Sequence, residues 1–327
     1  MGTRSSNRQG SIAGFVCSLF LLALMPEAIA QVAIGPVGPG AIQSQNRADI
    51  LRNPAAPLGT APPSGGEGGY VQASPNDNDL GEQQILQRKE EYLPFTFSAS
   101  TPVYYTSNVA LVNHGAQDDV MFAPGLVLTY QPHLTSTLYA EIGVAQQWFI
   151  YGRFSDLNFA SFDAIVGLAY YMPQFHNLTL RARYDYNSLT DTSFDQFFSN
   201  NSIILSGAVP FRIDRVQQIG IGFDVQLSFA ADPEGPRRND YSFWAGYSVN
   251  LTRHFSIDAT ARLAVRDYHV GSRTDVSEIL SLSANYRINQ WFTVSLLTSF
   301  SWNQSDRDVF DYSVADIGAG ISGGFQF

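Results

Sequence analysis

The chain has 327 residues, with 19 Lys and Arg against 29 Asp and Glu, a formal net charge of −10, and many aromatics, 23 Phe and 16 Tyr. The acidic balance argues against a nucleic-acid partner, because such a partner requires a basic protein face. No run reaches the ~18 apolar residues of a transmembrane helix. This does not exclude membrane-spanning strands, because apolar and polar residues alternate in them.

The first 30 residues have the three parts of a secretory signal. Arg4 and Arg8 supply the positive start, residues 12–24 the apolar core, and Ala28-Ile29-Ala30 the small-x-small cleavage site. We therefore expect cleavage near Ala30 and export of the mature chain. Cys17 is the only cysteine and lies inside this segment, so the mature chain has no thiol for a disulfide, a metal site or catalysis.

Residues 31–80 are dominated by Gly, Pro, Ala, Ser, Asn and Gln, as in 35–40 and 62–66. Such a segment buries too little to offset its ordering entropy, so it is predicted to be a disordered periplasmic linker. The alternative is a plug or a partner-binding arm. Residues 81–93 favour a short helix by propensity. This helix would either lead into the strand-rich region that follows or close the lumen of that region from below.

From residue 94 to residue 327 the chain shows the two-residue period of strands. In 217–230, Ile219, Phe223 and Leu227 face one way, while Gln218 and Asp224 face the other. We expect twelve strands, with ten or fourteen as alternatives. Their ranges are 95–105, 119–130, 136–150, 159–171, 177–187, 201–211, 217–230, 240–251, 255–267, 276–288, 291–302 and 313–327.

No helix-period segment covers the apolar strand faces, so lipid must cover them. The fold class is therefore all-β, a closed antiparallel up-and-down barrel in a membrane, apolar outside and polar inside. Short turns alternate with longer loops, expected at 106–118, 151–158, 188–200, 231–239, 268–275 and 303–312. This alternation is typical of outer-membrane barrels, with the turns and both chain ends on the periplasmic side. A β-propeller and a soluble sandwich fit the strand lengths less well.

The last strand ends in Gly323-Gly324-Phe325-Gln326-Phe327. A final strand with outward aromatics and a terminal Phe resembles the targeting signal of Gram-negative outer-membrane β-barrels, over about residues 94–327. The resemblance implies recognition of Phe325 and Phe327 by the barrel-assembly machinery, a bacterial outer-membrane location, and contact with lipid and lipopolysaccharide. The segment 102–108 is loosely similar to the start of porin-like barrels associated with polysaccharide export.

The inward face is where function is expected. Its charged positions are Glu141, Asp163, Arg181, Arg183, Asp185, Asp224, Asp258, Arg262, Arg266, Arg287 and Asp316. Two basic clusters are expected, Arg181 with Arg183 and Arg262 with Arg266 and Arg287. Rings of charge select solutes in pores, and arginine recognises carboxylate and phosphate through paired donors.

The sequence thus predicts a monomeric, porin-like channel for small polar or anionic solutes, including acidic oligosaccharides. One alternative is a closed, salt-bridged lumen in a structural or adhesive protein that binds partners through its loops or linker. A membrane-edge hydrolase is the remote alternative, with His269, Ser272 and Asp267 as the candidate triad fragment. No phosphate loop, zinc pattern or EF-hand is present, so neither cofactor, metal nor catalysis is expected.

Overall fold

A computed structural model of the chain describes residues 40–52 and 92–327. The helices are α1 (Ala41–Leu51) and the short 3-10 turns η2 (Ser155–Leu157), η3 (Pro173–Phe175) and η4 (Asp308–Phe310). The strands are β1 (Phe95–Ser100), β2 (Val103–Thr106), β3 (Asp119–Phe122), β4 (Gly125–Tyr130), β5 (Leu138–Tyr151), β6 (Phe159–Met172), β7 (Leu178–Thr190), β8 (Gln196–Arg212), β9 (Gln217–Asp232), β10 (Arg238–Asn250), β11 (Phe255–Tyr268), β12 (Thr274–Arg287), β13 (Phe292–Ser305) and β14 (Tyr312–Gln326).

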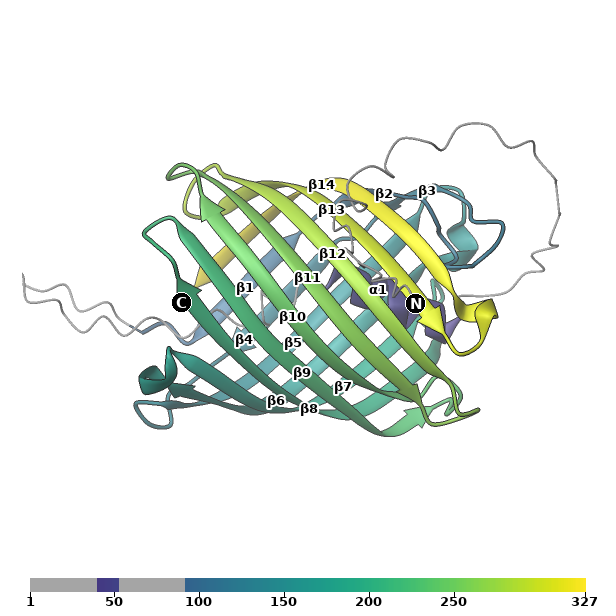
Figure 1. Cartoon of the computed structure of the whole chain (residues 1–327), viewed down its shortest axis with the longest axis horizontal. Coiled ribbons are helices and arrows are strands. Elements are labelled where there is room, and N and C mark those ends of the chain that lie inside the picture. The colour runs from purple at the N-terminus through teal and green to yellow at the C-terminus, as the bar shows by residue number, and fades with distance from the viewer. Residues whose placement is uncertain (1–39, 53–91) are drawn as a thin grey trace, which may run out of the picture. The chain divides into compact units, whose positions relative to one another are not determined.

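All strands belong to one antiparallel sheet that closes on itself (Figure 1). The seam joins β1 to β14, with Thr96 opposite Gln326 and Ser100 opposite Ser322. β1 and β2 both pair with β14, and β3 and β4 both pair with β5. Pro102 and Pro124 lie at these two breaks, where a residue without an N–H interrupts the ladder. The fourteen strand segments therefore make a twelve-stranded barrel, and the predicted strand count and fold class are confirmed.

The outer surface of the barrel is apolar. Large exposed side chains on outward positions include Val166, Leu168, Ile203, Leu205, Phe223, Phe243, Leu263, Leu280, Leu282, Leu296, Phe300 and Ile317. Aromatic side chains are exposed near both ends of the strands, among them Tyr170, Phe211 and Phe292 at one end and Tyr105, Tyr241 and Trp302 at the other. An apolar band flanked by two aromatic girdles is the surface that a lipid bilayer requires.

The connections at the two ends of the barrel differ less in length than the sequence predicts. We call the end with connections 131–137, 173–177, 213–216, 251–254 and 288–291 the turn end, and the opposite end the loop end. Both Pro94 and Phe327 lie at the turn end, which is periplasmic in outer-membrane barrels. At the loop end only 107–118 is long. The expected loop 188–200 shrinks to 191–195, because β7 and β8 continue their ladder beyond the predicted strand ends.

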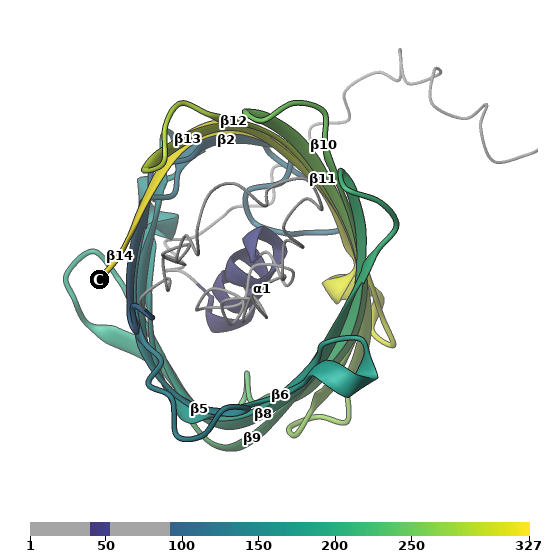
Figure 2. The ribbon, with the colours of Figure 1, turned by 90° about the vertical axis from the view of Figure 1, so that its left-hand side faces the viewer.

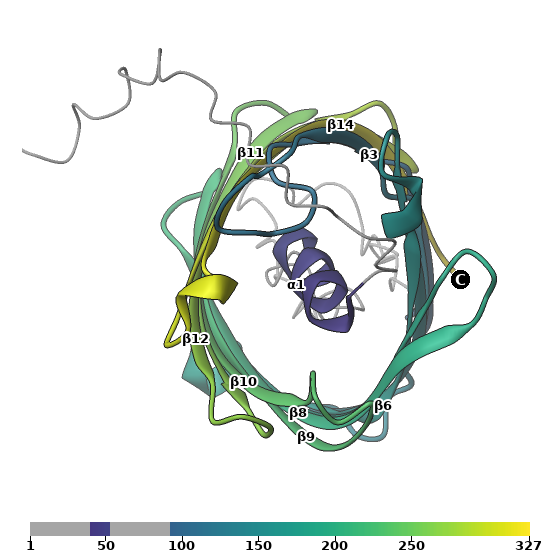
Figure 3. The same cartoon turned by 90° about the vertical axis from the view of Figure 1, so that its right-hand side faces the viewer.

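Helix α1 is the main departure from the predicted organisation. It lies inside the ring of strands (Figures 2 and 3), in a region expected to be a disordered linker. An isolated helix of 11 residues is marginal in water, so contacts with the barrel stabilise it. The prediction for 41–51 is therefore wrong. The signal segment, the rest of the linker and the expected lead-in helix at 81–91 lie outside the described residues.

Among the described residues, no helix is both long enough and apolar enough to cross a membrane.

Candidate functional site

Three arginines of the barrel wall converge on one carboxylate of α1. Arg262 Nη1 lies 3.0 Å from Asp49 Oδ1, and Arg266 Nη2 lies 2.6 Å from Asp49 Oδ2. Arg238 Nη2 is 4.0 Å from the same Oδ2, and Arg262 also donates to the Asp49 carbonyl. Burial raises the pKa of Asp49, but the attraction of the three guanidinium groups outweighs burial and holds that pKa well below its ordinary value. Asp49 is thus an ionised internal ligand of this arginine cluster.

The arginine cluster is held from behind by other barrel side chains. Arg266 Nη1 donates to Asn303 Oδ1 at 3.2 Å, and Arg238 Nη1 donates to the Tyr268 hydroxyl at 3.1 Å. Arg238 Nε lies 2.9 Å from Asp240 Oδ1. These partners belong to strands, so the barrel positions the guanidinium groups, and Asn46 of α1 adds one contact by accepting from Arg238 Nη1 at 2.6 Å.

A second ion pair anchors the middle of α1. Arg47 Nη1 lies 2.9 Å from Asp316 Oδ1 on β14, and the two side chains are 1% and 0% exposed. Arg47 Nη2 also donates to the carbonyl of Asn108 at 2.6 Å. Removing one partner of a buried ion pair costs about 3–5 kcal/mol, because the other charge is left without compensation.

Apolar contacts complete the seat of α1. Ile50 is 1% exposed and packs with Leu111, Ile279, Tyr312 and Val314. Ala41, Ala48 and Leu51 pack against a second cluster at the loop end, formed by Tyr104, Val109, Met121, Ala123, Phe149, Tyr151, Phe159, Leu189 and Phe198. The wall therefore matches α1 in both hydrophobicity and charge.

The C-terminal end of α1 faces acidic residues of the wall. The guanidinium of Arg52 is attracted by the carboxylates of Asp163, Asp185 and Asp224, three of the predicted lumen residues. Asn187 Nδ2 donates to Asp163 Oδ1 at 2.9 Å. Acidic wall residues thus lie opposite the basic end of α1, as basic wall residues lie opposite Asp49.

A separate charged cluster lies nearer the turn end. Arg181 Nε donates to Glu141 Oε1 at 3.0 Å, and Gln131 Nε2 donates to the same oxygen at 2.8 Å. Glu141 is on β5 and Arg181 on β7, so the arginine side chain crosses β6. Gly167 of β6 lies opposite both Glu141 and Arg183, and a Cβ there would lie 2.7 Å from Arg183 Cγ. A glycine on the intervening strand therefore leaves the space that the Arg183 side chain occupies.

The structure corrects one grouping of the predicted residues. Arg287 does not join Arg262 and Arg266, since the residue opposite Arg262 is Ile279 and Arg287 lies by His254 at the turn end. Its side chain is exposed. The period of two gives the face that a residue occupies but not the register of β11 against β12, so it cannot separate Arg287 from Arg262 and Arg266. Asp258 instead accepts a hydrogen bond from Asn285 Nδ2 at 2.6 Å.

Sequence reasoning missed Arg238, Arg47 and Asp49. The sequence pattern predicts a strand that begins at residue 240, two residues after the start of β10, and so places Arg238 in a loop. Arg47, Asp49 and Arg52 are the only charged residues between 31 and 66, and they lie in 41–53, which contains neither Gly nor Pro. That local change in composition was the available signal for an ordered helix.

The candidate hydrolase residues do not assemble into a triad. His269 Nε2 lies 3.2 Å from Asn239 Oδ1, an amide rather than a carboxylate orienting group. Ser272 and Asp267 make no contact with His269 among the side-chain hydrogen bonds of the described region. Within residues 40–52 and 92–327, no three His, Cys, Asp or Glu side chains gather as metal ligands.

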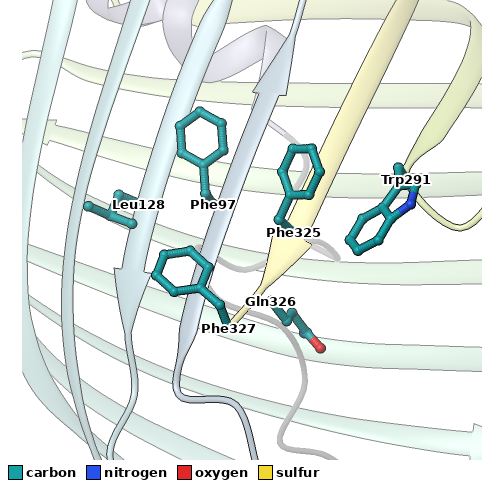
Figure 4. A pocket seen from close by; sticks show the side chains of 6 residues that line it. All are labelled: Phe97, Leu128, Trp291, Phe325, Gln326 and Phe327. Atoms are coloured by element: carbon teal, nitrogen blue, oxygen red, sulfur yellow. The ribbon is translucent and has the colours of Figure 1, made fainter.

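The predicted assembly residues lie outside the barrel, at the seam. Phe325 and Phe327 border an apolar groove with Phe97, Leu128 and Trp291 (Figure 4). Phe327 stacks on Phe95, with ring centroids 5.3 Å apart, and Trp291 lies 4.9 Å from Phe325. These aromatics pack across the junction that closes the barrel.

No protein-family model and no curated protein matches this chain. Among solved structures it is similar to an outer membrane channel from Pseudomonas putida F1, with a TM-score of 0.51 and 9% identity over 72% of this chain and 97% of that chain. The KdgM porin in complex with disordered oligogalacturonate has a TM-score of 0.40 and 9% identity, over 70% and 99% of the two chains. At 9% identity, the similarity to the Pseudomonas putida channel establishes a shared fold and nothing finer. This chain therefore shares the fold of that outer membrane channel, a closed antiparallel β-barrel.

Proposed function

We propose that the protein is a channel for small polar or anionic solutes, with α1 as a plug in the loop-end half of the lumen. The observation that carries this proposal is the distribution of inward arginines. Arg238, Arg262 and Arg266 lie in the loop-end halves of their strands, and Arg183 lies in the turn-end half of β7. No acceptor for Arg183 Nε is present among the described residues. An anion that moves along the lumen would therefore meet cationic groups at successive heights.

Arginine favours carboxylate-bearing solutes over simple halides. The planar guanidinium presents paired donors that match the two oxygens of a carboxylate, and it remains charged at all relevant pH values. Acidic oligosaccharides combine this group with hydroxyls that suit a serine-rich and asparagine-rich wall. They are the permeant class that the lumen chemistry favours.

α1 would limit conduction at rest. A cavity between α1 and the β11–β13 wall measures about 90 Å³, and it is lined by Ile50, Leu51, Arg52, Asp258 and Ser283 among others. A space of this size holds a few waters but not a sugar. We therefore expect small or rare openings in the resting protein and larger ones when α1 leaves its seat.

The test is single-channel conductance of the mature chain in a planar bilayer, with reversal potentials under a salt gradient. We expect anion preference, and Arg183→Gln should reduce it because a cation is lost from the lumen wall. Arg215→Gln, in an exposed turn outside the lumen, is the matched control. A folded barrel that is silent both with and without α1 would refute the channel.

The second candidate is a structural or adhesive protein with a permanently closed lumen. It is favoured by the burial of α1 and by its ion pairs to Asp316 and the arginine cluster. In that case deletion of α1 would weaken the barrel rather than open it. A lower temperature of heat-induced mobility change in gels, without any conductance, would support this candidate.

The remaining expectations on cellular context belong to the same proposal. The mature chain would begin after Ala30, act as a monomer, and contact lipopolysaccharide through its loop end. Phe325 and Phe327 would be read by the barrel-assembly machinery before they pack at the seam. Replacement of both by Ala should lower the amount of assembled barrel in cells but not its refolding in detergent.

A further inference from the structure

We propose that Arg238, Arg262 and Arg266 form a carboxylate-binding site for the permeating solute, and that Asp49 occupies this site at rest. An acidic sugar would then release α1 by replacing its carboxylate. This inference rests on the proposed channel function and assigns that channel a binding site, a ligand class and a means of opening.

The contacts of Asp49 are those expected for a bound carboxylate ligand. Its two oxygens are divided between Arg262 Nη1, at 3.0 Å, and Arg266 Nη2, at 2.6 Å. Arg262 and Arg266 use only the carboxylate and one carbonyl of the aspartate, whereas Arg238 also donates to Asn46 Oδ1 of α1 at 2.6 Å. The carboxylate of a uronic acid presents the same two oxygens.

The site has further binding capacity near the carboxylate. Arg262 and Arg266 are 8% and 0% exposed, and the Nε of each has no acceptor among the described residues. The buried hydroxyls of Ser277 and Ser301 likewise have no partner in the described part of the chain. Ser277 on β12 lies opposite Ala264, which stands between Arg262 and Arg266 on the inward face of β11. Ser301 on β13 lies opposite Ile279, the β12 residue that is paired with Arg262. Unused donors and hydroxyls beside a carboxylate site are suited to a sugar ring.

Electrostatics couples the release of α1 to anion binding. Suppose that Asp49 departed and no anion replaced it. Among the ion pairs of the described residues, Asp240 would then be the one carboxylate still in direct contact with the three buried guanidinium groups. Buried charges without compensation are strongly disfavoured, so a replacing anion stabilises the released state. By reciprocity, the internal carboxylate weakens the apparent affinity for the solute.

The test uses the refolded mature chain in detergent, with D-glucuronate as the probe and D-glucose as its neutral match. Hydrogen exchange of residues 41–51 should accelerate with glucuronate and remain unchanged with glucose, while the strands stay protected. In Asp49→Asn the internal competitor is lost, so glucuronate should bind about tenfold more tightly by calorimetry, within the usual range of such coupling.

Arg262→Gln should abolish the response to glucuronate, and Arg287→Gln, the same change at the turn end, should leave it intact. Equal effects of glucuronate and glucose, or unchanged affinity in Asp49→Asn, would overturn the inference. Asp49→Asn changes no barrel residue, so it remains informative even if Arg262→Gln fails to fold. Neither readout requires ion flow, so a silent bilayer with a positive exchange result would refute the channel but not the site.

Discussion

The two arginine clusters of the lumen obtain their counter-charges in different ways. At the turn end, Arg181 pairs with Glu141, and both belong to the wall, two strands apart. At the loop end, Arg262 and Arg266 pair with Asp49, more than 200 residues earlier in the chain. The first cluster braces two strands across β6. The second holds a helix that makes no hydrogen bond of the sheet ladder. Arginine therefore links strands of the wall in the first cluster and holds α1 inside the lumen in the second.

Deletion of residues 41–51 should have the largest effect, because it removes the helix proposed as the plug and leaves every strand in place. We expect a severalfold increase in single-channel conductance in planar bilayers. Deletion of residues 60–70, which shortens the chain equally, is the control. Equal conductance in the two deletion variants would show that α1 does not limit flow.

Asp316→Asn should release the middle of α1 without touching the arginine cluster. Arg47 would remain buried without its counter-charge, at a cost of about 3–5 kcal/mol to docking. Hydrogen exchange of 41–51 should therefore accelerate while the strands remain protected. Ser313→Ala, an exposed position on the same strand, provides the matched control. Unchanged protection of α1 would mean that apolar contacts alone hold it.

Glu141→Gln tests the other half of the comparison. Loss of this carboxylate leaves Arg181 buried and unpaired, which should destabilise the barrel by about 3 kcal/mol. The temperature at which the folded form converts to the unfolded form in gels should fall. Exchange of α1 should not change, since Glu141 has no contact with it in the described structure. Accelerated exchange of α1 would indicate that the two clusters are coupled.

Arg287→Gln should have the smallest effect. The side chain is exposed at the turn end, where water and salt screen its charge, so the expected change is within about 0.5 kcal/mol. Reversal potentials should match those of the wild type. A clear loss of anion preference would place a third selective position at the turn end.

The barrel itself could be predicted from local sequence. Strand positions such as Ile219, Phe223 and Leu227 alternate strictly with polar residues, and the period of two places them on one face without knowledge of the partners. The outward placement of the girdle aromatics and the inward placement of Arg181 and Arg262 follow from the same periodicity, whereas the strand breaks at Pro102 and Pro124 were not predicted. These properties depend on neighbours in the chain, so they can be read in order along it.

The occupied lumen could not be predicted in this way. That Arg266 faces Asp49, and Asp316 faces Arg47, depends on a segment that enters a space created only when β1 meets β14. Alternation reports which face a residue occupies but not its height or its distant partner, as the misplaced Arg287 shows. The sequence by itself determined the wall. The tertiary structure decided what the wall encloses, because ion pairs across a closed barrel join residues that local periodicity cannot relate.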